Sequence, residues 1–109
     1  MLGEESHRSV ADQFEQSVWT TLRLVPEGKV ISYGELARKA GFPGRSRHVG
    51  ACLKKLPKGS SLPWHRVVNA QRKLSFPPDS EKYREQKQRL LAESVMFSGS
   101  RIEPEYFLD

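Results

Sequence analysis

Apolar residues recur at spacings of three and four near the N-terminus, which is the pattern of one face of an amphipathic helix. This stripe consists of Val10, Phe14, Val18, Leu22 and Val25. Ser9, with Asp12 three residues later, has the pattern of a capping box that begins the helix. The stretch Pro26-Glu27-Gly28 is suited to end it. We therefore expect a helix from residue 10 to about residue 25.

Two shorter helical patterns follow. Ser32-Tyr33-Gly34-Glu35 is a second capping box and opens a helix that runs to Ala40. Gly41 is placed to end this helix in the left-handed conformation, and Phe42-Pro43-Gly44 form a turn. We expect a third helix over residues 45–56. Two short helices joined by a glycine-containing turn are typical of a helix-turn-helix.

The third helix has two contrasting faces. At about 100° per residue, one face carries Val49, Cys52, Leu53 and Leu56. The opposite face carries Arg47, Ala51 and Lys54, with Gly50 at its edge. Small residues let a helix backbone approach another surface closely, and long cations at its edges reach phosphates. This face therefore suits a helix that enters a DNA groove; the alternative is an ordinary solvated face.

The second half of the chain combines short extended segments with a further helix. We expect an extended run from His65 to Val68, a turn over residues 69–72 and a short strand over residues 73–76. Asp79 or Ser80 caps a charged helix that runs to Glu93. Its expected apolar contacts are Tyr83, Leu90 and Leu91. Residues 95–108, with a Ser-Gly-Ser turn signal, predict a small hairpin or wing.

The length of 109 residues suits one small domain. We expect residues 1–9 to form a flexible tail and residues 10–109 a winged helix-turn-helix, mostly α with small β elements. No run approaches the roughly 20 apolar residues that span a bilayer, and the polar N-terminus shows no secretory signal. The one cysteine, Cys52, excludes an intramolecular disulfide and the usual zinc-finger spacings. We therefore expect a cytoplasmic protein without metal or cofactor.

Charge is concentrated in the middle of the chain. The net charge is +5, but residues 29–76 hold eleven basic side chains and one acidic side chain, Glu35. The flanking segments carry net charges of −3 and −2. A block of this kind is typical of a surface that binds a polyanion. We favour nucleic acid as the partner over the alternative, a surface that serves only solubility.

Four segments resemble, in order and spacing, the DNA-binding domain of the O6-alkylguanine-DNA alkyltransferases. They are GKVISYGELARKAG, RSRHVGACL, PWHRVV and KQRLLAE, and the resemblance runs from about residue 12 to about residue 97. The central motif of these repair enzymes is proline-cysteine-histidine-arginine, whose cysteine accepts the alkyl group. Trp64 stands at that position, which is the mark of the non-catalytic alkyltransferase-like branch. An indole cannot replace the thiolate nucleophile, because its nitrogen is only a hydrogen-bond donor.

The resemblance implies a lesion pocket. Trp64 lines it in place of the cysteine, Val67 and Val68 form its wall, and Glu93 is a buried glutamate that holds His65. The implied pocket residues are Tyr33, Trp64, His65, Arg66, Val67, Val68 and Glu93. The alternatives are a plain core role for the tryptophan and the valines, and a solvated position for the glutamate.

The resemblance also implies contacts with DNA. Arg47 matches an arginine finger that fills the space left by an extruded nucleotide, and Tyr33 a tyrosine that crowds the adjacent phosphate. Gly50 and Ala51 match the small residues that let the helix enter the minor groove. The alternatives are a simple phosphate contact for the arginine and a partly buried aromatic for the tyrosine. The remaining expected phosphate contacts are Arg45, Lys54 and Lys55.

Two features depart from the alkyltransferases, and a third departs from some alkyltransferase-like proteins. Leu56 stands where the active enzymes have an asparagine, and the turn over residues 69–73 has no glycine. Phe76-Pro77-Pro78 occupies the pocket mouth, where some alkyltransferase-like proteins place an arginine. We also expect the chain to lack the separate N-terminal domain of the full-length enzymes.

These features predict a monomeric, non-enzymatic sensor of DNA damage. It would bind double-stranded DNA through the minor groove, flip an O6-alkylguanine into the pocket and hold it for nucleotide excision repair through a UvrA-type partner. One rival is an alkyltransferase that uses Cys52, but a cysteine on the apolar face of a helix has a high pKa. The other rival is a sequence-specific winged-helix regulator, in which PWHRVV has no role.

Overall fold

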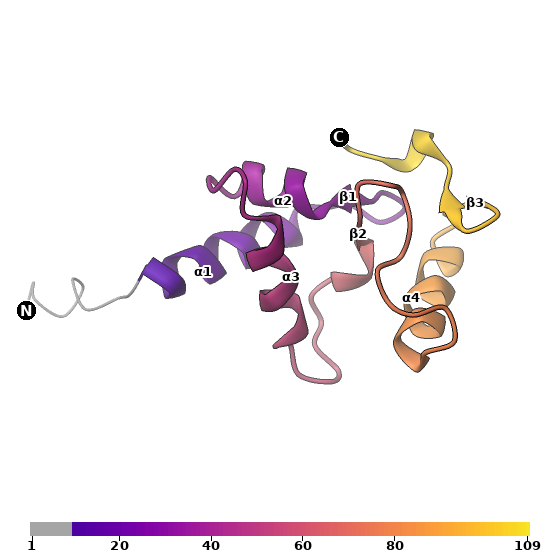
Figure 1. Cartoon of the computed structure of the whole chain (residues 1–109), viewed down its shortest axis with the longest axis horizontal. Coiled ribbons are helices and arrows are strands. Elements are labelled where there is room, and N and C mark those ends of the chain that lie inside the picture. Colours follow the sequence, from indigo (N-terminus) through magenta and orange to yellow (C-terminus); the bar gives the residue numbers. More distant parts are fainter. Residues whose placement is uncertain (1–9) are drawn as a thin grey trace, which may run out of the picture.

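The structure, a computed structural model, describes residues 10–109 as four α-helices with two small sheets (Figure 1). In chain order the elements are α1 (Val10–Arg23), β1 (Ile31–Ser32), α2 (Tyr33–Lys39), α3 (Ser46–Lys54), the 3-10 helix η2 (Trp64–Arg66), β2 (Val67–Val68), α4 (Glu81–Ala92), β3 (Phe97–Ser98), β4 (Arg101–Ile102) and the 3-10 helix η3 (Pro104–Tyr106). None of the helices within this range is long and apolar enough to cross a membrane. The expectations for the tail and for the Ser9 cap lie outside the described residues.

Helix α1 supplies one side of the first hydrophobic core. Phe14, Val18 and Leu22 are buried, as the stripe predicts. Val10 shares that face by its spacing, but it is 73% exposed at the first position of the helix and does not belong to the buried core. The helix ends at Arg23, two residues earlier than expected, and Val25 reaches the core from the loop that follows.

Helices α2 and α3 form the predicted helix-turn-helix. Ser32 caps α2, since its Oγ accepts a hydrogen bond from the Glu35 backbone N–H at 3.1 Å. The return contact of a capping box is not made: the Glu35 carboxylate binds Arg38 instead. Gly41 has φ +94°, the left-handed conformation expected at a helix C-terminus. The turn therefore sets α3 against α2, its neighbour in the first core.

A short parallel pair brings the PWHRVV segment beside this motif. Strand β1 pairs with β2, with Ile31 opposite Val67 and Ser32 opposite Val68. The expected extended run begins later than predicted, because Trp64–Arg66 forms the 3-10 helix η2 and only the two valines are a strand. Because the two strands are parallel, η2, which precedes β2, lies beside the loop that leads into β1, and the turn after β2 lies beside the N-terminus of α2.

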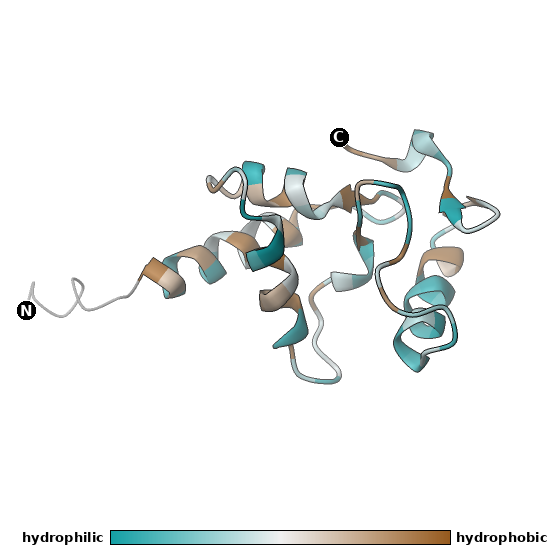
Figure 2. Cartoon of the chain, in the orientation of Figure 1, coloured by the Kyte–Doolittle hydropathy of each residue, from teal (hydrophilic) through white to brown (hydrophobic). Residues whose placement is uncertain are grey.

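A second core joins α4 to the C-terminal hairpin. Strands β3 and β4 pair in antiparallel fashion, as the turn signal predicts. The buried members of this core are Val30, Val68, Leu74, Leu90, Val95 and Ile102. Figure 2 shows that α4 is mostly hydrophilic, with hydrophobic residues at its C-terminal end. Leu91, expected as an apolar contact, is 50% exposed, because the next position along a helix is rotated by about 100° from Leu90.

The loop before α4 differs from the prediction. Residues 73–76 form no strand; Lys73 makes only an isolated bridge with Arg101. The preceding turn is built by Asn69, whose Oδ1 accepts hydrogen bonds from the backbone N–H groups of Gln71 and Lys73. Arg72 takes φ +68° in this turn, a conformation that glycine adopts more readily. The missing glycine is thus replaced by a strained arginine, which also donates a hydrogen bond to the Ile102 carbonyl.

Candidate nucleic-acid interface

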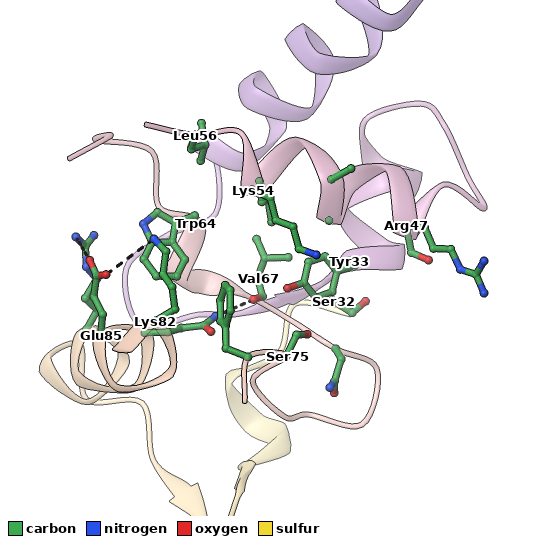
Figure 3. Close-up of a pocket in the computed structure, with 18 of the residues that line it drawn as sticks. Ser32, Tyr33, Arg47, Lys54, Leu56, Trp64, Val67, Ser75, Lys82 and Glu85 are labelled. Atoms are coloured by element: carbon green, nitrogen blue, oxygen red, sulfur yellow. Dashed lines mark hydrogen bonds and ion pairs between the residues drawn. The ribbon is translucent and has the colours of Figure 1, made fainter. Parts of the chain in front are cut away.

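A cavity of about 890 Å³ lies between the helix-turn-helix and α4. Residues from α2, α3, η2, β2, α4 and the intervening loops share its surface (Figure 3). Its lining residues are Ser32, Tyr33, Gly34, Ser46, Arg47, Gly50, Ala51, Leu53, Lys54, Leu56, Pro57, Lys58, Gly59, Trp64, Val67, Asn69, Ala70, Ser75, Phe76, Pro77, Lys82, Glu85, Gln86 and Arg89. The exposed face of α3 and the PWHRVV segment therefore open onto one space.

Trp64 is a wall of this cavity, although it is only 9% exposed. Its ring meets the Phe76 ring edge to face, with centroids 6.2 Å apart. The Lys82 ammonium lies 4.1 Å from the centroid of the indole ring, and the Arg89 guanidinium 5.4 Å. These contacts are cation–π interactions, in which a cation is attracted to the electron-rich face of the ring. The cavity thus offers an aromatic wall with positive charge beside it.

Glu93 is the centre of a polar network behind the Trp64 wall. His65 Nε2 lies 2.7 Å from its Oε2, Arg66 donates to both carboxylate oxygens, and the Gly28 backbone N–H donates at 2.9 Å. Burial alone would raise the pKa of Glu93, but the hydrogen bonds from Arg66, Gly28 and His65 outweigh it and lower the pKa to about 2. Arg66 also donates to the Val25 carbonyl. The network therefore ties η2 to the end of α4 and to the loop after α1.

The environment of His65 favours the neutral form of its imidazole. Burial lowers its pKa, and the opposing effect of the hydrogen bond with Glu93 is weaker. Because Arg66 already compensates the Glu93 charge, His65 need only donate its Nε2 proton to the carboxylate. Its Nδ1 is buried and has no hydrogen-bond partner within residues 10–109. The histidine that would assist a nucleophile is thus in place, although Trp64 offers nothing for it to deprotonate.

The cavity face of α3 has the composition expected for close contact. Arg47, Gly50, Ala51 and Lys54 all line the cavity, and Arg47 points outward from the start of α3 in Figure 3. A methyl group at Gly50 would lie 3.9 Å from the Tyr33 ring, an ordinary van der Waals distance. Packing within the chain therefore does not require a glycine there. Close approach by another molecule, such as DNA, would explain a glycine at this position.

Some expected site residues lie elsewhere. His65, Arg66 and Glu93 do not line the cavity but support its wall from behind. Val68 is not a pocket wall: it is fully buried in the second core, because successive residues of a strand point to opposite faces and Val67 takes the cavity side.

Two of the expected phosphate contacts also lie outside the cavity. Arg45 is exposed at the N-cap of α3. The Lys55 ammonium lies 3.0 Å from the Glu15 carboxylate, on the side of α1. This ion pair leaves Lys54 as the better placed lysine of the two.

Sequence reasoning missed the contribution of α4. Lys82, Glu85, Gln86 and Arg89 line the cavity, and their spacings of three, four and seven place them on one helical face. That spacing was the available signal, but the face is polar and gives no hydrophobic stripe. Gln86 is 1% exposed, and its Nε2 donates to the His65 and Val67 carbonyls at 3.2 and 3.0 Å. It therefore holds PWHRVV against α4.

Cys52 is not part of the cavity. It is 5% exposed and belongs to the first core, on the face of α3 opposite the cavity. Burial raises the pKa of its thiol, and the nearby Glu15 carboxylate adds to this effect. A thiol of this kind is a poor nucleophile. Residues 10–109 contain no group of three or more His, Cys, Asp or Glu side chains that could hold a metal ion.

Comparison with known proteins identifies relatives along most of the chain. The family described as "6-O-methylguanine DNA methyltransferase, DNA binding domain" matches residues 13–95. The DNA base-flipping protein of Escherichia coli (strain K12) is 48% identical over 100 residues, covering 91% of this chain and 75% of that protein. Alkyltransferase-like protein 1 of Schizosaccharomyces pombe is 39% identical over 84 residues, covering 77% of this chain and 78% of that protein.

Solved structures of two such proteins share the fold. S. pombe Atl1 in complex with damaged DNA containing O6-carboxymethylguanine superposes with a TM-score of 0.79 at 35% identity, covering 90% of this chain and 96% of that chain. Mycobacterium tuberculosis OGT in complex with DNA gives a TM-score of 0.65 at 35% identity, covering 73% of this chain and 48% of that chain. The expected mostly α fold of the helix-turn-helix type is confirmed.

Proposed function

We propose that this chain, which belongs to the family of the 6-O-methylguanine DNA methyltransferase DNA-binding domain, is a non-enzymatic sensor of O6-alkylguanine in DNA. One observation carries the proposal: the wall of the cavity is an indole, Trp64, while Cys52, the one cysteine of the sequence, is buried in a core on the other side of α3. Alkyl transfer needs a nucleophile at the alkyl carbon. An indole wall can only contact the base.

Binding would begin on the backbone of double-stranded DNA. Arg47, Lys54 and Lys58 line the α3 side of the cavity and are exposed, so they can reach phosphates. Gly50 and Ala51 would let α3 enter the minor groove between these cations. The E. coli relative is named a DNA base-flipping protein, and S. pombe Atl1 is solved in complex with damaged DNA; both support DNA as the partner.

The damaged base would then rotate into the cavity. Extrusion costs a few kcal/mol of unstacking and unpairing, and less for a base that pairs poorly, which in itself favours a lesion over guanine. Tyr33 lines the cavity at the start of α2, where it would crowd the phosphate and favour rotation. Arg47 would fill the vacated place in the stack. Trp64 and Val67 would contact the extruded base. The Glu93 network and Gln86 hold the segment that carries these two side chains in place.

A protein that holds a lesion without repairing it requires a partner that removes it. We assign that role to nucleotide excision repair, with a UvrA-type protein as the partner, and place the chain as a monomer on DNA in the cytoplasm or nucleoid.

Two measurements on the same samples test the proposal. Duplexes that differ only by guanine or O6-methylguanine at one position should bind with different affinities, the lesion more tightly. Intact-mass analysis after incubation should show no methyl group on the protein. Equal affinities would reject the sensor, and a methylated peptide at Cys52 or elsewhere would reject the non-enzymatic role. Tight binding to one undamaged sequence would favour a transcription regulator.

A further inference from the structure

The cations of the cavity form two separate groups. Arg47, Lys54 and Lys58 belong to α3 and the loop that follows it, whereas Lys82 and Arg89 belong to α4. Figure 3 shows Lys82 and Glu85 together with Trp64 on one side of the cavity, and Lys54 and Arg47 toward the other. The first group lies on the helix and the adjoining loop that would face the DNA backbone. The second group lies at the aromatic wall, where an O6 substituent of an extruded base would end.

The α4 group retains a net positive charge at the face of Trp64. Glu85 is the one acidic residue among the residues that line the cavity, and it faces two cations. Its carboxylate lies 2.9 Å from Arg89 but 3.9 Å from Lys82. A separation of 3.9 Å is longer than a hydrogen bond, so Glu85 does not satisfy the N–H groups of Lys82. The Lys82 side chain is half exposed, and its ammonium remains available to a ligand.

We infer that Lys82, with Arg89 beside it, makes the cavity selective for O6 substituents that carry a negative charge, such as a carboxyalkyl group, over neutral substituents of the same shape. This inference rests on the proposed function and adds to it the chemical class of lesion. Lys82 is a specificity residue that the sequence did not indicate.

The physical reason is the cost of removing a carboxylate from water. An anionic substituent that enters a partly closed cavity loses hydration and is destabilised unless a cation compensates it. The ammonium 4.1 Å from the Trp64 ring is already at the place where the substituent would lie. A carboxylate there gains a charge-assisted hydrogen bond, while its methylene group contacts the indole. A neutral amide of the same shape gains only the apolar contact and a weaker hydrogen bond.

Four duplexes of one sequence separate this readout from phosphate binding. They carry guanine, O6-methylguanine, O6-carboxymethylguanine or O6-carbamoylmethylguanine at one position, and the last two differ in charge but hardly in shape. We expect the wild-type protein to bind the carboxymethyl duplex about 3- to 10-fold more tightly than the carbamoylmethyl duplex, the range for a partly exposed charged hydrogen bond. Lys82→Met should reduce this ratio to about 1. Lys82→Glu should favour the carbamoylmethyl duplex.

Lys58→Met is the matched control, because Lys58 lines the same cavity but lies on the loop after α3. It should weaken all four complexes by the same factor and leave the carboxymethyl-to-carbamoylmethyl ratio unchanged. The inference is overturned if Lys82→Met also weakens all four complexes equally, since Lys82 would then contact a phosphate. It is also overturned if the wild-type ratio is 1 while O6-methylguanine is still preferred to guanine. If the wild-type protein does not prefer O6-methylguanine to guanine, the proposed function itself is rejected.

Discussion

The Nε2 atom of His65 lies 2.7 Å from Oε2 of Glu93, and the same carboxylate receives hydrogen bonds from Arg66 and from the backbone of Gly28. Residues far apart in the sequence thus meet at one partly buried anion. The pKa of Glu93 falls from its ordinary value of 4.5 to about 2, which corresponds to about 3 kcal/mol of stabilisation. The network is therefore a principal support of the Trp64 wall.

Glu93→Gln should lower the free energy of unfolding by about 3 kcal/mol near neutral pH. Because the pKa of Glu93 is lower in the folded state, its contribution is fully present above pH 4.5 and is lost as the pH falls toward 2. The difference between wild type and variant should shrink over that interval in urea unfolding. Glu27→Gln, at an exposed position, is the control. A constant difference from pH 7 to pH 2 would show that the Glu93 charge is not the cause.

The turn of the helix-turn-helix depends on the conformation of Gly41. With φ at +94°, a β-carbon at this position is strained, so Gly41→Ala should lower the free energy of unfolding by about 1 kcal/mol or more. Gly34→Ala is the matched substitution, because Gly34 lies inside α2 with open space around it. It should stabilise the protein by up to about 1 kcal/mol. Chemical denaturation measures the free energy of unfolding of both variants. Equal destabilisation by the two substitutions would contradict the claim that the left-handed conformation of Gly41 requires a glycine.

Part of this architecture was predictable from the chain, for local reasons. The α1 stripe, the Ser32 cap and Gly41 act within a few residues, and the structure has them as predicted, except that Val10 is exposed and Glu35 does not complete the capping box. The position of Val68 was not predicted, although strand alternation allows only one of two adjacent valines to face the cavity. The approach of α4 to Trp64 depends on tertiary packing between segments far apart in the chain, and no local pattern reports it.

Lys54 and Lys55 should differ in their effect on DNA binding. Lys54 lines the cavity, whereas the Lys55 ammonium is paired with Glu15. Lys54→Ala should weaken binding to damaged and undamaged duplexes alike, and lower the slope of log affinity against log salt by about 1. Lys55→Ala should have the smaller effect on both quantities. Salt titrations of DNA binding compare the two variants. A larger loss of affinity for Lys55→Ala would contradict the claim that Lys54, and not Lys55, faces the DNA.

Arg47 should discriminate between damaged and undamaged DNA. If it fills the stack after the base leaves, Arg47→Ala should lose on the order of 1–3 kcal/mol more affinity for a lesion duplex than for plain DNA. Arg45→Ala is the control, since Arg45 is also an exposed arginine near the start of α3 but does not line the cavity. It should weaken both complexes equally. The same pattern for Arg47→Ala would reduce Arg47 to a phosphate contact.

The most direct test of the account is the affinity of Trp64→Ala for two duplexes that differ only by guanine or O6-methylguanine, at one salt concentration. Trp19→Ala serves as the control, because Trp19 packs against the first core and does not line the cavity; circular dichroism verifies that both variants are folded. The account predicts that Trp64→Ala loses about 1–3 kcal/mol more on the lesion duplex than on the guanine duplex, while Trp19→Ala loses equally on both. Equal losses for Trp64→Ala would contradict the claim that its indole receives the damaged base.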